Sequence, residues 1–180
     1  SLLTVDLGQQ YIDFFSYFRR TLLSNPRGFF YSFSKEVGGN MVGEWAYYLM
    51  SPFNLFLLLF PEKDLAAGIM LITLLKYGCA GLSFGYFLKK MRTHSGLTIV
   101  AFATSYAMMG WFVANQLNLL WLDATIFLPL IVLQLHRLLS GKRSWPYIVL
   151  LAIMLIDNYY MGYMICLFLV LYFIWFVLSS

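Results

Sequence analysis

Charged residues are scarce in this sequence of 180 residues. Asp, Glu, Lys and Arg together make up 11%, whereas hydrophobic residues make up 61% and aromatic residues 19%. A soluble domain usually carries about 25% charged residues and fewer apolar ones. This composition excludes an ordinary water-soluble globular domain and indicates a membrane protein.

Residues typical of metal and redox sites are also few. Cys79 and Cys166 stand alone in apolar runs without a CxxC or CxxH motif, and His94 and His136 belong to no HxH or HExxH motif. These spacings predict neither a zinc site nor a redox pair. The sequence also lacks a Gly-rich phosphate loop, which argues against a nucleotide-driven pump. No cofactor is predicted, although a divalent cation held only by carboxylates stays an open alternative.

Long apolar runs dominate the chain after residue 64. Roughly 20 apolar residues are needed to cross the hydrocarbon core of a bilayer. The runs are long enough, the fourth of them only as a tilted or locally thinned crossing. We therefore predict an all-α membrane protein, a polytopic helical bundle whose spans are residues 65–88, 97–114, 117–139, 145–158 and 161–178.

Two short basic stretches carry the excess of Lys and Arg behind the net charge of +4. They are KKMR at Lys89–Arg92 and HRLLSGKR at His136–Arg143. Short basic loops stay in the cytoplasm, so these stretches indicate topology rather than a nucleic-acid partner. With both loops inside, residues 1–64 and the turns at 115–118 and 157–160 lie outside. The segment 1–64 is therefore predicted to be an extracytoplasmic loop.

This loop contains amphipathic segments. In LGQQYIDFFSYFRRTLL, Leu7 and the aromatic residues recur at helical spacing, which predicts an amphipathic helix. Such a juxtamembrane helix is expected to lie along the membrane surface, with packing onto another part of the protein as the alternative. MVGEWAYYLM predicts a second short helix. SPFN predicts the start of a third, with Ser51 as N-cap and Pro52 at the first helical position.

Several polar residues of the loop are candidates for chemistry. Asp6 either caps a helix in the capping-box pattern D-L-G-Q or acts as a general base at the membrane surface. Asp13 follows seven residues later, so it lies on the same helix face and lines the same groove, unless it is simply solvated or paired. Arg19 and Arg20 can bind a phosphate or face solvent and lipid headgroups. Glu44, close to a Gly-Gly turn, is a further candidate for this cleft.

Other candidates lie in or beside the predicted spans. Asp123 is a few residues below the outer surface, where a carboxylate needs a partner. Lys76 is the only Lys or Arg deep inside a span, so we predict that the two pair, either as a structural ion pair or in a cleft that meets a charged substrate. Asp157, Asn158 and Tyr159 follow at the outer end of the last two spans as candidate substrate contacts. An aromatic belt would also explain the tyrosine.

Taken in order, VDLGQQYIDFFSYFRRTLL, GGN, SPFN-LF, W-LDA---LPL and DNYYMGYM resemble the YfhO family of bacterial membrane proteins. The resemblance covers nearly the whole chain and implies a GT-C-type glycosyltransferase fold in the bacterial cell membrane. It also implies an acidic catalytic residue in the first extracytoplasmic loop, a position that Asp6 matches. The implied reaction moves a sugar from a polyprenyl-phosphate donor to an extracytoplasmic envelope polymer, of the teichoic-acid type.

Two other functions stay open. One is a transporter or lipid flippase with Asp123 and Lys76 along its path, and the other is a non-catalytic envelope-assembly subunit. A transporter places intramembrane charges around broken helices at the midplane, whereas most polar residues here fall at the outer face, which favours surface chemistry. The chain opens at Ser1 without an initiator Met. We therefore expect a piece of a longer protein, and this piece alone need not be active.

Overall fold

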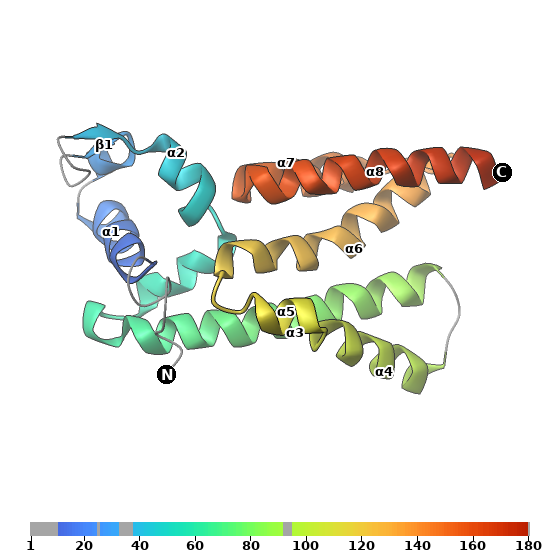
Figure 1. The fold of residues 1–180 in the computed structure, drawn as a ribbon, viewed down its shortest axis with the longest axis horizontal. Coiled ribbons are helices and arrows are strands. Elements are labelled where there is room, and N and C mark those ends of the chain that lie inside the picture. Colours follow the sequence, from blue (N-terminus) through green and yellow to red (C-terminus); the bar gives the residue numbers. More distant parts are fainter. Residues whose placement is uncertain (1–10, 25, 33–37, 92–94, 180) are drawn as a thin grey trace.

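The computed structural model describes residues 11–24, 26–32, 38–91 and 95–179, and nearly all of its elements are helices (Figure 1). The main helices are α1 (Ile12–Leu23), α3 (Leu65–Met91), α4 (Gly96–Ala107), α5 (Gly110–Ala114), α6 (Leu119–Leu139), α7 (Trp145–Asp157) and α8 (Tyr159–Ser179). The shorter elements are η2 (Pro26–Phe29), β1 (Tyr31–Ser32), β2 (Gly39–Asn40), α2 (Val42–Glu44), η3 (Trp45–Leu49), η4 (Pro52–Leu59) and η5 (Glu62–Asp64).

Each predicted apolar run is helical, with differences at the ends. Within the described residues, four helical stretches are long and apolar enough to cross a membrane: Glu62–Met91, Gly96–Ala114, Leu119–Leu139 and Tyr159–Ser179. This confirms the all-α membrane class. The predicted span 145–158 is the shorter apolar helix α7, of 13 residues. At 1.5 Å per residue it covers roughly 20 Å, so a complete crossing by α7 stays a prediction.

The predicted span 97–114 is two helices rather than one. α4 ends at Ala107, and Met109 takes an extended backbone conformation before α5 starts at Gly110. The last helix also starts earlier than predicted, because only Asn158 separates α7 from α8. Hydropathy does not place the break between α4 and α5, since the residues around it are mostly apolar, whereas the polar turn between α7 and α8 was predicted at 157–160.

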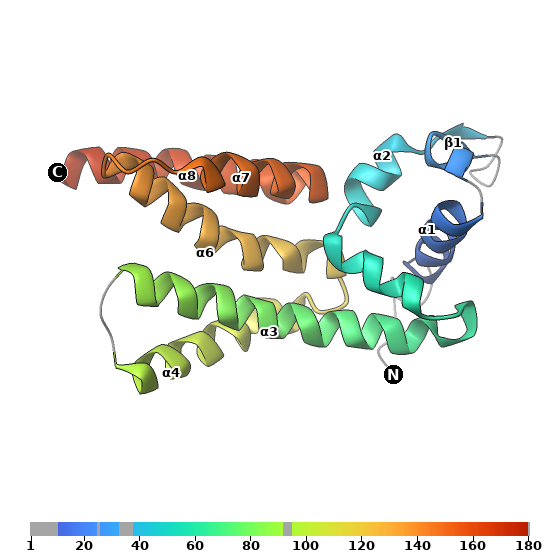
Figure 2. The same ribbon diagram turned by 180° about the vertical axis from the view of Figure 1, so that it is seen from behind.

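The bundle and the loop occupy opposite ends of the molecule. The described residues of the segment 11–64 gather around the N-terminal end of α3, while the C-terminal end of α3, with Lys89 and Lys90, and the α6–α7 connection lie at the other end (Figures 1 and 2). The α7–α8 turn lies on the side of the loop, where it contacts η3. The hydropathy and charge pattern predicted the same grouping of these segments at the two ends. Which end lies outside the cell stays a prediction.

α6 is the central helix. In the most apolar segment of α6, 78% of the residues are buried, compared with 11% in the α4–α5 stretch and 17% in α8. It packs against α3, α7 and α8. The exposed apolar surfaces of α4 and α8 suit the hydrocarbon core of a bilayer, because apolar side chains avoid water.

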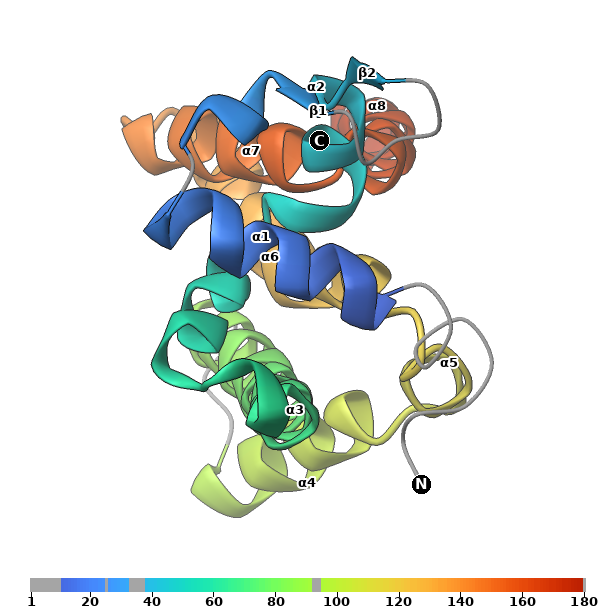
Figure 3. The ribbon, with the colours of Figure 1, turned by 90° about the vertical axis from the view of Figure 1, so that its left-hand side faces the viewer.

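The aromatic stripe of α1 is buried in the protein. Tyr11, Phe15 and Phe18 are almost fully covered, and the ring of Phe18 lies 5.4 Å from that of Trp45 in η3. Figure 3 shows α1 crossing over the end of the bundle. This face therefore packs onto another part of the protein, the alternative left open above, and is not available to the membrane surface. Leu7 lies outside the described residues.

The two short helices predicted after α1 are present, the first with a π-helical turn and the second as a 3-10 helix. α2 continues directly into the π-helical turn η3, and η4 is a 3-10 helix with Ser51 at its N-cap and Pro52 in the first turn. The Ser51 side chain makes no capping hydrogen bond. Instead the buried Asn54 side chain donates to the backbone carbonyl of Leu49 at 3.1 Å and holds η4 against η3.

Close packing of α7 on α8 depends on Gly162. A Cβ atom at this position would lie 2.8 Å from Leu155 Cδ2 and 3.2 Å from Leu155 Cα. We expect Gly162→Ala to destabilise the protein by about 1–3 kcal/mol, because the added methyl group forces the two helices apart. Gly78→Ala is the matched control in α3, since nothing lies within 4 Å of its added Cβ. Thermal unfolding in detergent micelles measures both, and equal stabilities would contradict this packing.

Candidate functional site

A cavity of about 360 Å³ opens in the loop end of the molecule, between α1, β1 and α2. Three residues predicted to bind substrate, Asp13, Arg20 and Glu44, line this cavity. The remaining lining residues are Phe14, Ser16, Tyr17, Ser32 and Met41. The structure therefore brings two carboxylates, a guanidinium and several hydroxyl groups to one concave surface.

The spacing of α1 explains why these side chains converge. Asp13 and Arg20 are seven residues apart, which is two helical turns, so both point away from the buried aromatic stripe. Glu44 comes from α2, which follows the small β1–β2 hairpin in which Tyr31 pairs with Asn40. The hairpin returns the chain to α1 and so places Glu44 opposite it.

Arg20 is held in position by Glu62 of η5. Its Nε lies 2.6 Å from Glu62 Oε1 and its Nη2 3.3 Å from Glu62 Oε2, a bidentate arrangement. This hydrogen-bonded contact raises the pKa of Arg20. Ser16 donates to the same carboxylate at 3.5 Å. Sequence reasoning missed Glu62, because a surface partner 42 residues away leaves no local signal.

Arg19 does not belong to the cavity lining. Its side chain is half-buried, and its Nε makes no hydrogen bond to any of the described residues. Neighbouring positions on a helix point about 100° apart, and of the two adjacent arginines only Arg20 lines the cavity. Of the predicted phosphate-binding pair, the structure thus places Arg20 at the cavity.

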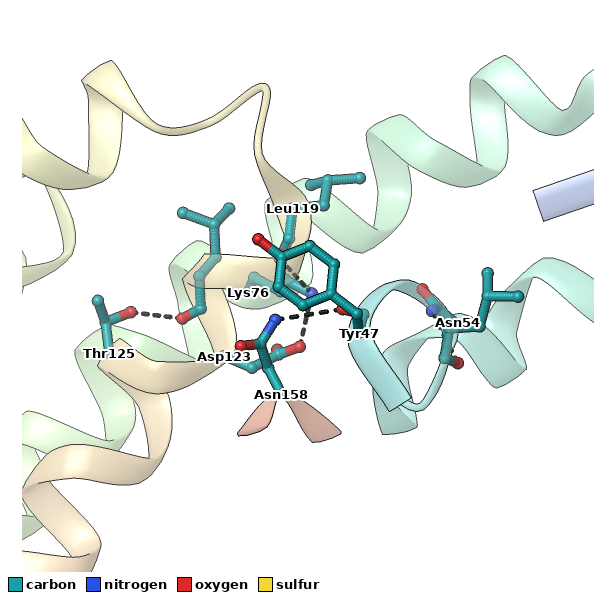
Figure 4. A network of polar contacts seen from close by, with 9 residues as sticks. Tyr47, Asn54, Lys76, Leu119, Asp123, Thr125 and Asn158 are labelled. Atoms are coloured by element: carbon teal, nitrogen blue, oxygen red, sulfur yellow. Dashed lines mark hydrogen bonds and ion pairs between the residues drawn. The ribbon is translucent and has the colours of Figure 1, made fainter. Parts of the chain in front are cut away.

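A second polar group lies at the junction of the loop and the bundle (Figure 4). Lys76 Nζ of α3 is 2.8 Å from Asp123 Oδ2 of α6 and donates a second hydrogen bond, also of 2.8 Å, to the Leu119 carbonyl. The exposed fractions of the two side chains are 1% and 0%. The predicted pairing is confirmed, and in this structure both side chains are closed to a substrate.

Asp157 and Asn158 are buried beside this pair, with exposed fractions of 3% and 0%. Asn158 Nδ2 donates to the Tyr47 carbonyl at 3.2 Å, while Asn158 Oδ1 accepts from the Met161 N–H at 2.9 Å and so caps α8. The Asp157 carboxyl group interacts with both Asp123 and Lys76. These two residues therefore join the bundle to the loop rather than lining open space.

A chain of aromatic rings connects the cavity to this junction. Phe14, which lines the cavity, stacks on Tyr48 with ring centroids 4.8 Å apart, and Tyr48 lies 4.7 Å from Tyr47. Tyr47 in turn lies 5.7 Å from Tyr159, whose side chain is exposed. The sequence contained a signal for this chain in the consecutive tyrosines of MVGEWAYYLM, which were assigned only to a short helix.

Two further predictions concern the catalytic base and a divalent cation. Asp6, the predicted catalytic base, lies outside the described residues. Among the described residues there is no group of three or more His, Cys, Asp or Glu side chains that could hold a metal ion. A divalent cation therefore stays an open alternative.

The ion pair allows a double-mutant test. We expect Lys76→Met and Asp123→Asn each to destabilise the protein by about 3–5 kcal/mol, because each removes one partner of a buried, hydrogen-bonded ion pair. The double variant should recover much of this loss. Unfolding of the four proteins in detergent measures the coupling energy, and additive losses would refute a direct interaction.

Comparison with known proteins agrees with the membrane architecture. No curated protein and no solved structure matches the chain. The family model described as "Bacterial membrane protein YfhO" matches residues 1–180. With the whole of this sequence covered, the chain belongs to the YfhO family of bacterial membrane proteins.

Proposed function

We propose that the protein is a membrane glycosyltransferase of the GT-C type. It would move a sugar from a polyprenyl-phosphate donor to an extracytoplasmic acceptor in the cell envelope, of the teichoic-acid type. The observation that carries this proposal is the convergence of Asp13, Arg20 and Glu44 on one cavity at the end of the molecule opposite the basic connections.

The chemistry of the cavity suits a sugar attached to a phosphate. Carboxylate and hydroxyl oxygens accept hydrogen bonds from sugar hydroxyls, and an aromatic ring such as that of Phe14 offers an apolar wall. The guanidinium of Arg20 has five N–H donors. Glu62 engages two of its nitrogen atoms and orients the group, which leaves donors for a phosphate oxygen.

A lipid-linked donor also needs a place for its isoprenoid chain. An apolar groove of about 390 Å³ lies between α4–α5, α6 and α8. Its lining includes Tyr106, Trp111, Leu128, Met164 and Phe168, and no charged side chain. Flexible methionines and aromatic rings suit a long unsaturated chain at this depth. The groove supports the lipid-linked half of the proposal.

In the proposed reaction Asp6 is the general base. Its carboxylate would take the proton from an acceptor hydroxyl, whose oxygen attacks the anomeric carbon of the donor sugar. The bond from this carbon to the phosphate oxygen breaks, and the polyprenyl phosphate leaves with its negative charge stabilised by Arg20. Asp6 shortly precedes, in sequence, the helix that lines the cavity.

The transporter alternative depends on Lys76 and Asp123 lining a path. In the structure these side chains are paired and buried at the loop end of the bundle, which favours a structural role for them. The alternative of a non-catalytic assembly subunit predicts no transfer activity at all, so an assay separates it from the proposed enzyme.

The first test is sugar transfer by the full-length protein in liposomes, with a panel of radiolabelled polyprenyl-phosphate sugars as donors. We expect transfer by the parent and a loss of about 100-fold or more in Asp6→Asn, since general bases contribute roughly 10²–10⁴-fold. Asp64→Asn is the control, because Asp64 is an exposed carboxylate at the end of η5. Transfer from no donor would favour the transporter or the assembly subunit, and full activity of Asp6→Asn would remove Asp6 from the mechanism.

The second test separates the cavity from the ion pair that supports it. We expect Arg20→Gln to raise KM for the donor by about 10-fold or more, because a charged hydrogen bond is worth roughly 1.5–3 kcal/mol. Glu62→Gln breaks the same ion pair but leaves the guanidinium at the cavity, so its KM should change much less. Equal effects of the two variants would mean that Arg20 acts only through Glu62.

A further inference from the structure

Two carboxyl groups at the junction each keep one buried oxygen without a hydrogen-bond donor among the described residues. These atoms are Asp123 Oδ1 and Asp157 Oδ2. Both side chains are at least 97% buried. A buried carboxylate oxygen without a donor loses its hydration and gains nothing in return, so this arrangement needs an additional hydrogen.

The surrounding charges lead to the same requirement. α3 contributes the Lys76 ammonium and the Cys79 thiol, which interacts with Asp123. α6 contributes Asp123, η3 contributes the neutral backbone carbonyl of Tyr47, and α8 begins next to the neutral Asn158 side chain. Among the described residues one positive charge therefore faces two carboxyl groups. With both ionised, the buried group would carry an uncompensated negative charge.

We propose that Asp157 and Asp123 share one proton in the folded protein, which makes the junction a buried proton-binding site. Asp157, as a neutral acid, donates its O–H to the free oxygen of Asp123. Asp123 stays ionised because its other oxygen accepts from Lys76. The shared proton supplies the missing donor, and the three side chains together become neutral. Two carboxyl groups in contact cannot both ionise readily in a site of low polarity.

This site connects proton binding to the position of the loop. Asp157 is the last residue of α7, and the next residue, Asn158, caps α8 and donates to the Tyr47 carbonyl. Loss of the proton would place two repelling carboxylates at the turn and displace Asp157 towards water. The contact between Asn158 and Tyr47 would weaken with it, so the attachment of the loop that carries the cavity depends on this proton.

The test follows the stability of the full-length protein in detergent against pH. A group that is neutral in the folded state and ionised in the unfolded state binds more protons when folded, so its contribution to stability falls as the pH rises. Asn is a neutral side chain of the same size at every pH. The unfolding equilibrium constants of the parent and of Asp157→Asn are compared at each pH. For every pH unit, we expect the constant of the parent to rise by a factor up to about tenfold larger than that of Asp157→Asn. Asp64→Asn, with its exposed side chain, should keep the slope of the parent.

Equal slopes of the parent and Asp157→Asn would overturn the proposal. If that variant does not fold, infrared spectroscopy of Asp157→Glu tests the same state without removing the carboxyl group. The expected result at neutral pH is a difference in the C=O stretch of a protonated carboxylic acid between parent and variant, with a shift in D₂O. A spectrum without any protonated-acid difference would overturn the shared proton. Neither measurement depends on transferase activity, so the proposed function and this site can fail separately.

Discussion

The ion pair between Lys76 and Asp123 is the constraint on which the arrangement of the helices depends. A charge buried in an apolar bundle is tolerated only beside its partner, so the pair fixes the register of α3 against α6. The α7–α8 turn then has to bring Asp157 and Asn158 to the same place. The loop rests on this junction through the Tyr47 carbonyl. Elements that are far apart in the sequence are thus organised around one buried ion pair.

Much of the bundle was predictable because length and hydropathy act locally. Each apolar run is helical, and the pairing of Lys76 with Asp123 followed from the lack of other charges at that depth. The break between α4 and α5 was not predictable, since Met108 and Met109 are as apolar as their neighbours. The burial of the α1 stripe was also ambiguous, because protein and lipid select the same aromatic side chains.

The candidate site was predictable only within single elements. Asp13 and Arg20 were each predicted as substrate contacts, and the structure places both at the cavity, two helical turns apart on α1. That Glu44 would join them from α2, and that Glu62 would orient Arg20, depends on tertiary contacts for which sequence spacing carries no information. For Asp157 the polar turn was recognised, whereas its inward direction follows from the charges of two other helices.

The π-helical turn η3 has a consequence for the loop as a whole. Its five residues direct two consecutive tyrosines to different neighbours, Tyr48 to Phe14 of α1 and Tyr47 to Tyr159 of α8. Adding or removing one residue would rotate the following side chains by about 100°. The length of this turn is therefore under tighter constraint than its composition. Substitutions that preserve an aromatic ring keep the connection, whereas a single insertion or deletion would uncouple the cavity from the bundle.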